Sequence, residues 1–154
     1  MDSPSVPPTA TLVVAPDMSL TVATSLLNEV AAHADSEGIC LAAAVVDRGG
    51  NVVASMRMDN AQLGAMSLAL DKAVTAVSFG YPTRAWSTSS APGGSDWGLA
   101  HTLGGRAVVF PGGVPVFADG ALVGGLGVSG ASSDVDEKCA VGAVMSTGLA
   151  AGSA

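Results

Sequence analysis

A lysine within an apolar helical run is the residue of this sequence best placed to do chemistry. Lys72 lies in "SLALDKAVTAVSF", and the segment "RMDNA" before it supplies Arg57 and Asp59. An ammonium group beside a dry pocket is a strong point donor to the carboxylate of a ligand. The same lysine is equally consistent with a partly buried ion pair to Asp59 or Asp47. Both interpretations stay open: a pocket for a carboxylated metabolite, and an internal ion pair.

A serine follows a predicted strand and precedes a predicted helix, which is the setting of a hydrolase nucleophile. Ser129 lies in "GVSGA", but Ala131 stands where the nucleophile pattern requires a second glycine. A serine nucleophile also needs a histidine and an acid that the fold brings to it. We therefore interpret Ser129 as the end of a strand and the start of a turn.

The chain has two histidines, His33 and His101, and two cysteines, Cys40 and Cys139. Their spacing matches no zinc motif, so we expect no metal site and two free thiols. A haem iron takes an axial ligand from His, Cys, Met or Tyr, and the macrocycle requires an apolar slot. His33 on the first predicted helix and His101 in a loop rich in Gly and Ser are the candidate axial ligands.

The composition favours one apolar domain that assembles with copies of itself. Hydrophobic residues make up 49% of the 154 residues and charged residues only 12%, whereas soluble domains carry roughly 25% charged residues. One small subunit cannot hide so much apolar surface, so we expect a homo-oligomer. The net charge of -7 repels phosphate backbones, which makes nucleic acid a poor partner.

The sequence also bears on compartment and domain organisation. It has no apolar run of the ~18 residues that cross a membrane. The first seventeen residues contain no Lys or Arg that would form the start of a signal peptide. We expect a cytoplasmic protein with a disordered lead over residues 1–17 and a single domain over residues 18–151.

Hydrophobic periodicity predicts three helices and about five strands. The helices are expected over 18–37, 63–79 and 133–149, with a short helical piece after Thr83 and a capping box formed by Ser133 and Asp136. The strands are expected at "ICLAAAVVD", "VVASMRM", "RAVVF", "VPVFA" and "ALVGGLGVS". Their meander order predicts an α+β domain, an antiparallel sheet flanked by helices. Glycines in the last strand leave room for a ligand, a helix or another backbone.

Four motifs, taken together, resemble a known family. The segments "AVVDRGGNVVASMRMDNA", "ALDKAVTAVSFGYPT", "FPGGVPVFADGALVGGLGVSG" and "DEKCA" are similar, in this order and spacing, to the GlcG/HbpS-like haem-binding family. That family includes the C-terminal domain of PduO-type proteins. The resemblance covers about residues 20–150 and implies a five-stranded α+β fold that assembles into oligomers up to octamers.

The resemblance also implies a ligand site. Some members bind haem, and in the PduO-like branch a histidine of the first helix is a ligand, which points to His33. Positions that match the family motifs, and at which we expect ligand contacts, are Arg57, Asp59, Lys72, Thr75, Gly112, Gly113 and Ser129. Three functions follow as hypotheses: a binding protein for haem or a similar ligand, an enzyme for a carboxylated metabolite near Lys72, or an accessory oligomer without a ligand.

Overall fold

The structure is a computed structural model, and it describes residues 12–152. Its regular elements are α1 (Leu20–Glu37), β1 (Ala42–Val46), β2 (Val52–Arg57), α2 (Ala65–Phe79), β3 (Gly113–Ala118), β4 (Ala121–Ser129) and α3 (Ser133–Ser146). Three short 3-10 turns, η1 (Thr83–Trp86), η2 (Leu99–His101) and η3 (Leu103–Gly105), lie between α2 and β3. None of the described helices has the length and apolar character needed to cross a membrane. Residues 1–11 of the predicted lead lie outside the described part of the chain.

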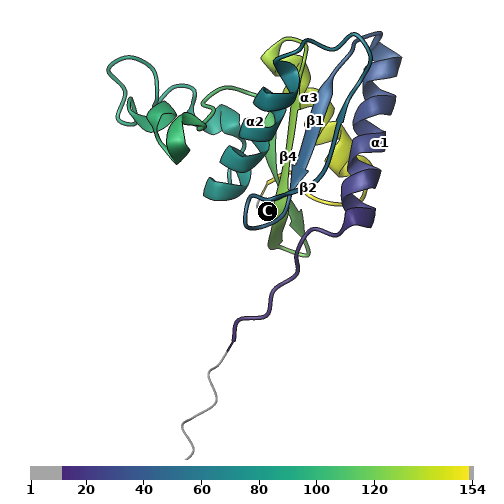
Figure 1. Ribbon diagram of the computed structural model, residues 1–154. Helices are drawn as coiled ribbons and strands as arrows, with labels where there is room; N and C mark the ends of the chain where they lie inside the picture. Colours follow the sequence, from purple (N-terminus) through teal and green to yellow (C-terminus); the bar gives the residue numbers. More distant parts are fainter. Residues whose placement is uncertain (1–11, 153–154) are drawn as a thin grey trace, which may run out of the picture.

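The four strands form one antiparallel sheet in the order β2-β1-β4-β3. Helix α2 covers one face of this sheet, while α1 and α3 lie side by side on the other (Figure 1). The domain therefore has three layers, as expected for the α+β class. The long connection between α2 and β3 projects away from the body of the domain on the α2 side (Figure 1).

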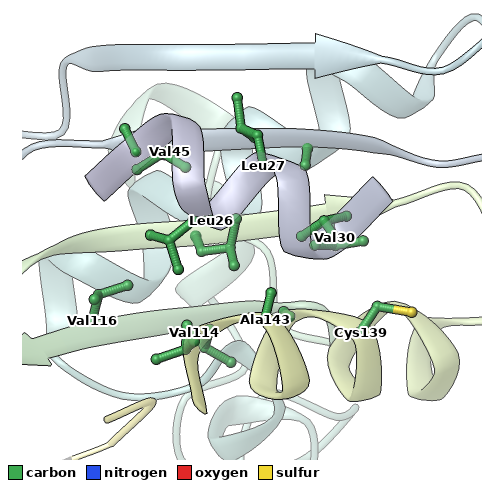
Figure 2. Close-up of a cluster of buried hydrophobic side chains, with 14 of the residues drawn as sticks. Leu26, Leu27, Val30, Val45, Val114, Val116, Cys139 and Ala143 are labelled. Carbon is green, nitrogen blue, oxygen red and sulfur yellow. The ribbon is translucent and has the colours of Figure 1, made fainter. Parts of the chain in front are cut away.

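Strand β1 is apolar along its whole length because both of its faces are buried. Ala43 and Val45 point into the main core beneath α1 and α3, whereas Ala44 and Val46 pack under α2. Figure 2 shows the main core, in which side chains of α1 and α3 meet those of the sheet. Packing on two sides thus explains why this strand shows no alternation of polar and apolar residues.

The glycines of β4 allow α2 to approach the sheet closely. A Cβ atom on Gly127 would overlap the backbone of Ala69 and Ala73 in α2, and a Cβ atom on Gly125 would overlap the carbonyl of Ala73. Of the three uses predicted for these glycines, the structure selects helix packing at Gly125 and Gly127.

The predicted α+β class with an antiparallel sheet is confirmed, although within residues 12–152 the sheet has four strands where about five were expected. The segment "RAVVF", residues 106–110, is not a strand. The Val108 N–H donates to the Thr75 hydroxyl of α2 at 3.0 Å instead of pairing with a strand. Ala107 and Val108 are buried against the domain, which explains their apolar character without a place in the sheet.

The predicted capping box of the last helix is also wrong. The N-cap of α3 is Ser132, and its side chain makes no capping hydrogen bond. Asp136 accepts a hydrogen bond from the Ala131 N–H at 2.9 Å through Oδ1, and its other oxygen has a partner on a different helix. The helix ends at Ser146, and Ala150 beyond it pairs with Phe117 of β3.

Candidate functional site

Lys72 is completely buried, and its ammonium group is held by groups of the protein itself. Nζ donates to the Val128 carbonyl at 2.9 Å and to Oδ2 of Asp136 at 2.8 Å. It also lies 5.5 Å from the centre of the Phe110 ring, within range of a cation–π interaction. Burial lowers the pKa of Lys72, and the hydrogen bond and charge of Asp136 oppose that change. The ion-pair interpretation is thus confirmed, but the partner is Asp136 and not Asp59 or Asp47.

Two glycines make room for this lysine. A Cβ atom on Gly112 would overlap Nζ of Lys72, and Gly112 has a φ of +126°, which side-chain-bearing residues rarely adopt. A Cβ atom on Gly113 would overlap the Lys72 carbonyl. The structure thus brings together Lys72, Gly112 and Gly113 of the predicted site, and the close packing of these residues encloses the ammonium group.

Two buried threonines hold the chain that leads into β3. The Thr75 hydroxyl donates to the Asp71 carbonyl at 2.7 Å and accepts from the Val108 N–H. The Thr83 hydroxyl accepts from the Gly113 N–H at 3.0 Å. Both hydroxyl groups therefore satisfy backbone groups, which is how buried hydroxyls are ordinarily accommodated.

Arg57 and Asp59 do not join this cluster. Both are exposed, and Arg57 is the last residue of β2, two strands away from Ser129 at the same level of the sheet. With neighbouring strands about 5 Å apart, the two backbones are about 10 Å apart. Ser129 is buried at the end of β4, where it pairs with Ala42 of β1. The predicted site residues therefore do not line one pocket.

His33 lies half-buried in a hollow between α1 and α3. The hollow measures about 50 Å³ and is lined by His33, Glu37, Val135, Lys138 and Cys139. The imidazole faces Gly142 of α3, where an added Cβ atom would lie 3.0 Å from Nε2. Cys139 lines the same hollow, and burial and the charge of Asp136 raise the pKa of its thiol.

His101 is exposed in η2, on the long connection that projects from the α2 side. Helix α1, which carries His33, lies across the sheet from that connection (Figure 1). The two histidines of one chain therefore do not meet at one site. The described residues contain no group of three or more His, Cys, Asp or Glu side chains arranged to hold a metal ion.

Sequence reasoning missed the residues that surround His33 and the partner of Lys72. Glu37 follows His33 by one helical turn, and Val135, Lys138, Cys139 and Gly142 follow one another at helical spacing on α3. Those spacings define one face on each helix, but they do not reveal that the two faces meet. Asp136 was assigned to a local helix cap because its partner in the fold, Lys72, lies 64 residues earlier and no sequence pattern connects the two.

The side chains and the size of the hollow decide whether it fits haem. An imidazole is a suitable axial ligand, and Val135 supplies apolar surface. The volume of about 50 Å³ is far below the ~300–1,000 Å³ of ligand pockets. The donor thus fits, whereas the hollow itself is too small to enclose a macrocycle.

Comparisons with known proteins agree with this architecture. The corrinoid adenosyltransferase PduO of Salmonella typhimurium is 39% identical over 100 residues, which are 65% of this chain and 30% of PduO. The chain therefore spans less than a third of that relative. A solved PduOC:heme complex has a TM-score of 0.84 and 31% identity, and the match covers 88% of this chain and 99% of that one.

A double mutant of Streptomyces reticuli HbpS has a TM-score of 0.79 and 32% identity, with 93% of this chain and 98% of that chain covered. The family described as "Haem degrading protein HbpS-like" matches residues 18–145. The matched residues include α1, α2 and all four strands of the sheet. They also include α3 except for its last residue, Ser146. This chain therefore belongs to the HbpS-like family.

Proposed function

We propose that this protein binds haem or a similar tetrapyrrole, with His33 as the axial ligand of the iron. The observation that carries the proposal is the likeness of nearly the whole domain to the PduOC:heme complex, at 31% identity and a TM-score of 0.84. The half-buried imidazole of His33, beside an apolar side chain and a basic side chain, adds support from this chain's own residues.

The surroundings of His33 suit a ligand with an apolar body and acidic edges. Val135 would offer apolar contact to such a ligand. Lys138 is exposed at the same rim, so its ammonium group is free to pair with a carboxylate of the ligand. Bound haem would supply a redox-active iron, and the residues of this chain would hold and orient it.

The location and assembly of the protein belong to the same proposal. We place it in the cytoplasm, an assignment supported by two cysteines that form no disulfide in the described residues. We also propose a homo-oligomer, as the composition of the sequence led us to expect. The high apolar content supports the same assembly.

The enzymatic alternative loses its basis in the structure. That alternative required the Lys72 ammonium group to face a ligand. The ammonium group instead contacts Asp136, the Val128 carbonyl and the Phe110 ring. The hollows beside α1 and α3 are lined by other residues. Binding is therefore the single function that we propose.

A hemin titration of the purified, metal-free protein followed by absorbance tests the proposal. We expect saturation at a defined ratio, a loss of affinity of about tenfold or more in His33→Ala, and no change in His101→Ala, which removes an exposed imidazole instead. Circular dichroism of both variants would verify that the fold is intact. Titration without saturation, or equal affinity in His33→Ala and the unaltered protein, would overturn the assignment.

A further inference from the structure

The segment before α1 exposes three consecutive apolar residues. Leu12, Val13 and Val14 are 81%, 93% and 94% exposed. We call residues 12–16 the N-terminal arm; it has no regular secondary structure and runs away from the sheet (Figure 1). Single exposed apolar residues are ordinary, whereas three in a row form an apolar segment that another surface could cover. Within residues 12–152, no other segment covers this run.

The sheet has a matching open edge at β2. Within residues 12–152, the strand pairing and backbone hydrogen bonds connect β2 only to β1. Its sequence, VVASMR, has one charged residue and no proline, and Val52 is 51% exposed. Natural sheets ordinarily block such an edge with charges, proline or a covering segment, because it offers unpaired N–H and C=O groups to another strand.

The opposite edge of the sheet is protected. Strand β3 contains Pro115, which cannot donate a hydrogen bond. Ala150 also pairs with Phe117 there, through two backbone hydrogen bonds of 2.8 and 3.0 Å. The contrast leaves β2 as the edge where the sheet can gain a strand.

We propose that the N-terminal arm of one copy pairs with the outer edge of β2 in a second copy. The arm is about 16 Å long when extended, and β2 is about 20 Å long, so their lengths suit each other. Leucine and β-branched valines are residues that favour strands. Two copies that exchange arms form a closed pair with twofold symmetry, in which each open edge and each apolar arm is covered.

The exit of the arm is fixed by Asp17. Its Oδ1 accepts hydrogen bonds from the Met18 N–H at 2.8 Å and from the Arg48 N–H, in the β1–β2 turn, at 2.9 Å. The arm therefore leaves the domain beside the start of β2 but points outward. This exit lets two copies, related by a twofold axis near the turn, place their arms on each other's edge strands.

Assembly mass gives the first test. We expect the unaltered protein to sediment as a dimer or a multiple of one, and the double variant Val13→Asp/Val14→Asp to fall to half of that mass or less. Val52→Lys should do the same, because an inserted lysine blocks an edge strand. Leu63→Asp, at an apolar residue that is 87% exposed elsewhere, is the control and should keep the full mass. A monomeric unaltered protein, or unchanged mass in the arm variant, would overturn the proposal.

Photo-crosslinking identifies the surface that the arm contacts. With Val13 replaced by benzoylphenylalanine, irradiation should give a dimer band on a denaturing gel, with the crosslinked peptide mapping to residues 52–57. A crosslink to residues 52–57 within one chain would show that the arm pairs with its own sheet, and would overturn the proposal. A dimer crosslinked elsewhere, or no crosslink, would do so too.

Discussion

Nζ of Lys72 lies 2.8 Å from Oδ2 of Asp136, and this contact joins helices on opposite faces of the sheet. Both side chains are nearly inaccessible, at 1% and 3% exposure. The carbonyl of Val128 accepts a second hydrogen bond from the same ammonium group, so the end of β4 is tied to both helices. The most conspicuous functional group of the sequence therefore holds the three layers together.

Removing one partner of this ion pair should destabilise the protein strongly. Lys72→Met leaves the carboxylate of Asp136 buried without its counter-charge, and the expected loss is about 3–5 kcal/mol of unfolding free energy. The double variant Lys72→Met/Asp136→Leu should lose less than the sum of the single changes, because it leaves no unpaired charge. Urea unfolding of the four proteins measures both quantities. Strictly additive losses would show that the two groups are not coupled.

The sequence predicted the elements well where one local pattern sufficed. Helical spacing located α1 and α2 to within two residues at each end. The strand predicted at residues 106–110 failed because apolar residues there are buried without a neighbouring strand, and one buried segment looks like another in sequence.

The site was harder to predict because its contacts lie between elements. Asp136 has a suitable position for a helix cap, and only the fold shows that Lys72 reaches it. The residues around His33 come from two helices whose facing sides are not marked by any short motif. The glycines of β4, in contrast, predicted that some group approaches this strand closely, but they did not identify that group as helix α2.

A methyl group at Gly127 should separate α2 from the sheet. In Gly127→Ala the new Cβ atom would overlap the backbone of Ala69 and Ala73, which cannot move aside as a side chain can. We expect a loss of about 1–3 kcal/mol or more of unfolding free energy, measured by urea denaturation. Gly98→Ala is the matched control, since Gly98 has an ordinary φ of -85° and open space around it. Equal stability of the two variants would contradict the packing role of Gly127.

The turn between β1 and β2 should weaken in acid. The backbone N–H of Asn51 is the main cause that lowers the pKa of Asp47 below its ordinary value of 3.8, helped by the Asn51 side chain and the Gly49 N–H. A carboxylate whose pKa is lower in the folded state stabilises that state above pH 3.8, and this stabilisation disappears as the pH falls through the lowered value.

The stability difference between the unaltered protein and Asp47→Asn should therefore be full near neutral pH and vanish in strong acid. Urea midpoints measured from about pH 7 to about pH 2 give the profile. Asp59→Asn, at an exposed carboxylate, is the control for the general effect of removing a negative charge. A difference for Asp47→Asn that is constant with pH would contradict the assigned cause.

A small change opposite His33 should separate ligand binding from folding. In Gly142→Ala the new Cβ atom lies 3.0 Å from the imidazole, so the ring must shift slightly, while the helix gains up to about 1 kcal/mol from the better helix former. We expect unfolding free energy to change by less than about 1 kcal/mol. Hemin affinity should fall about three- to tenfold, because axial ligation depends on the position of the ring nitrogen. Gly64→Ala, at the start of α2 with open space around it, is the control and should leave hemin affinity unchanged. Unaltered affinity in Gly142→Ala, alongside weak binding in His33→Ala, would show that the imidazole does not bind the iron from its place between α1 and α3.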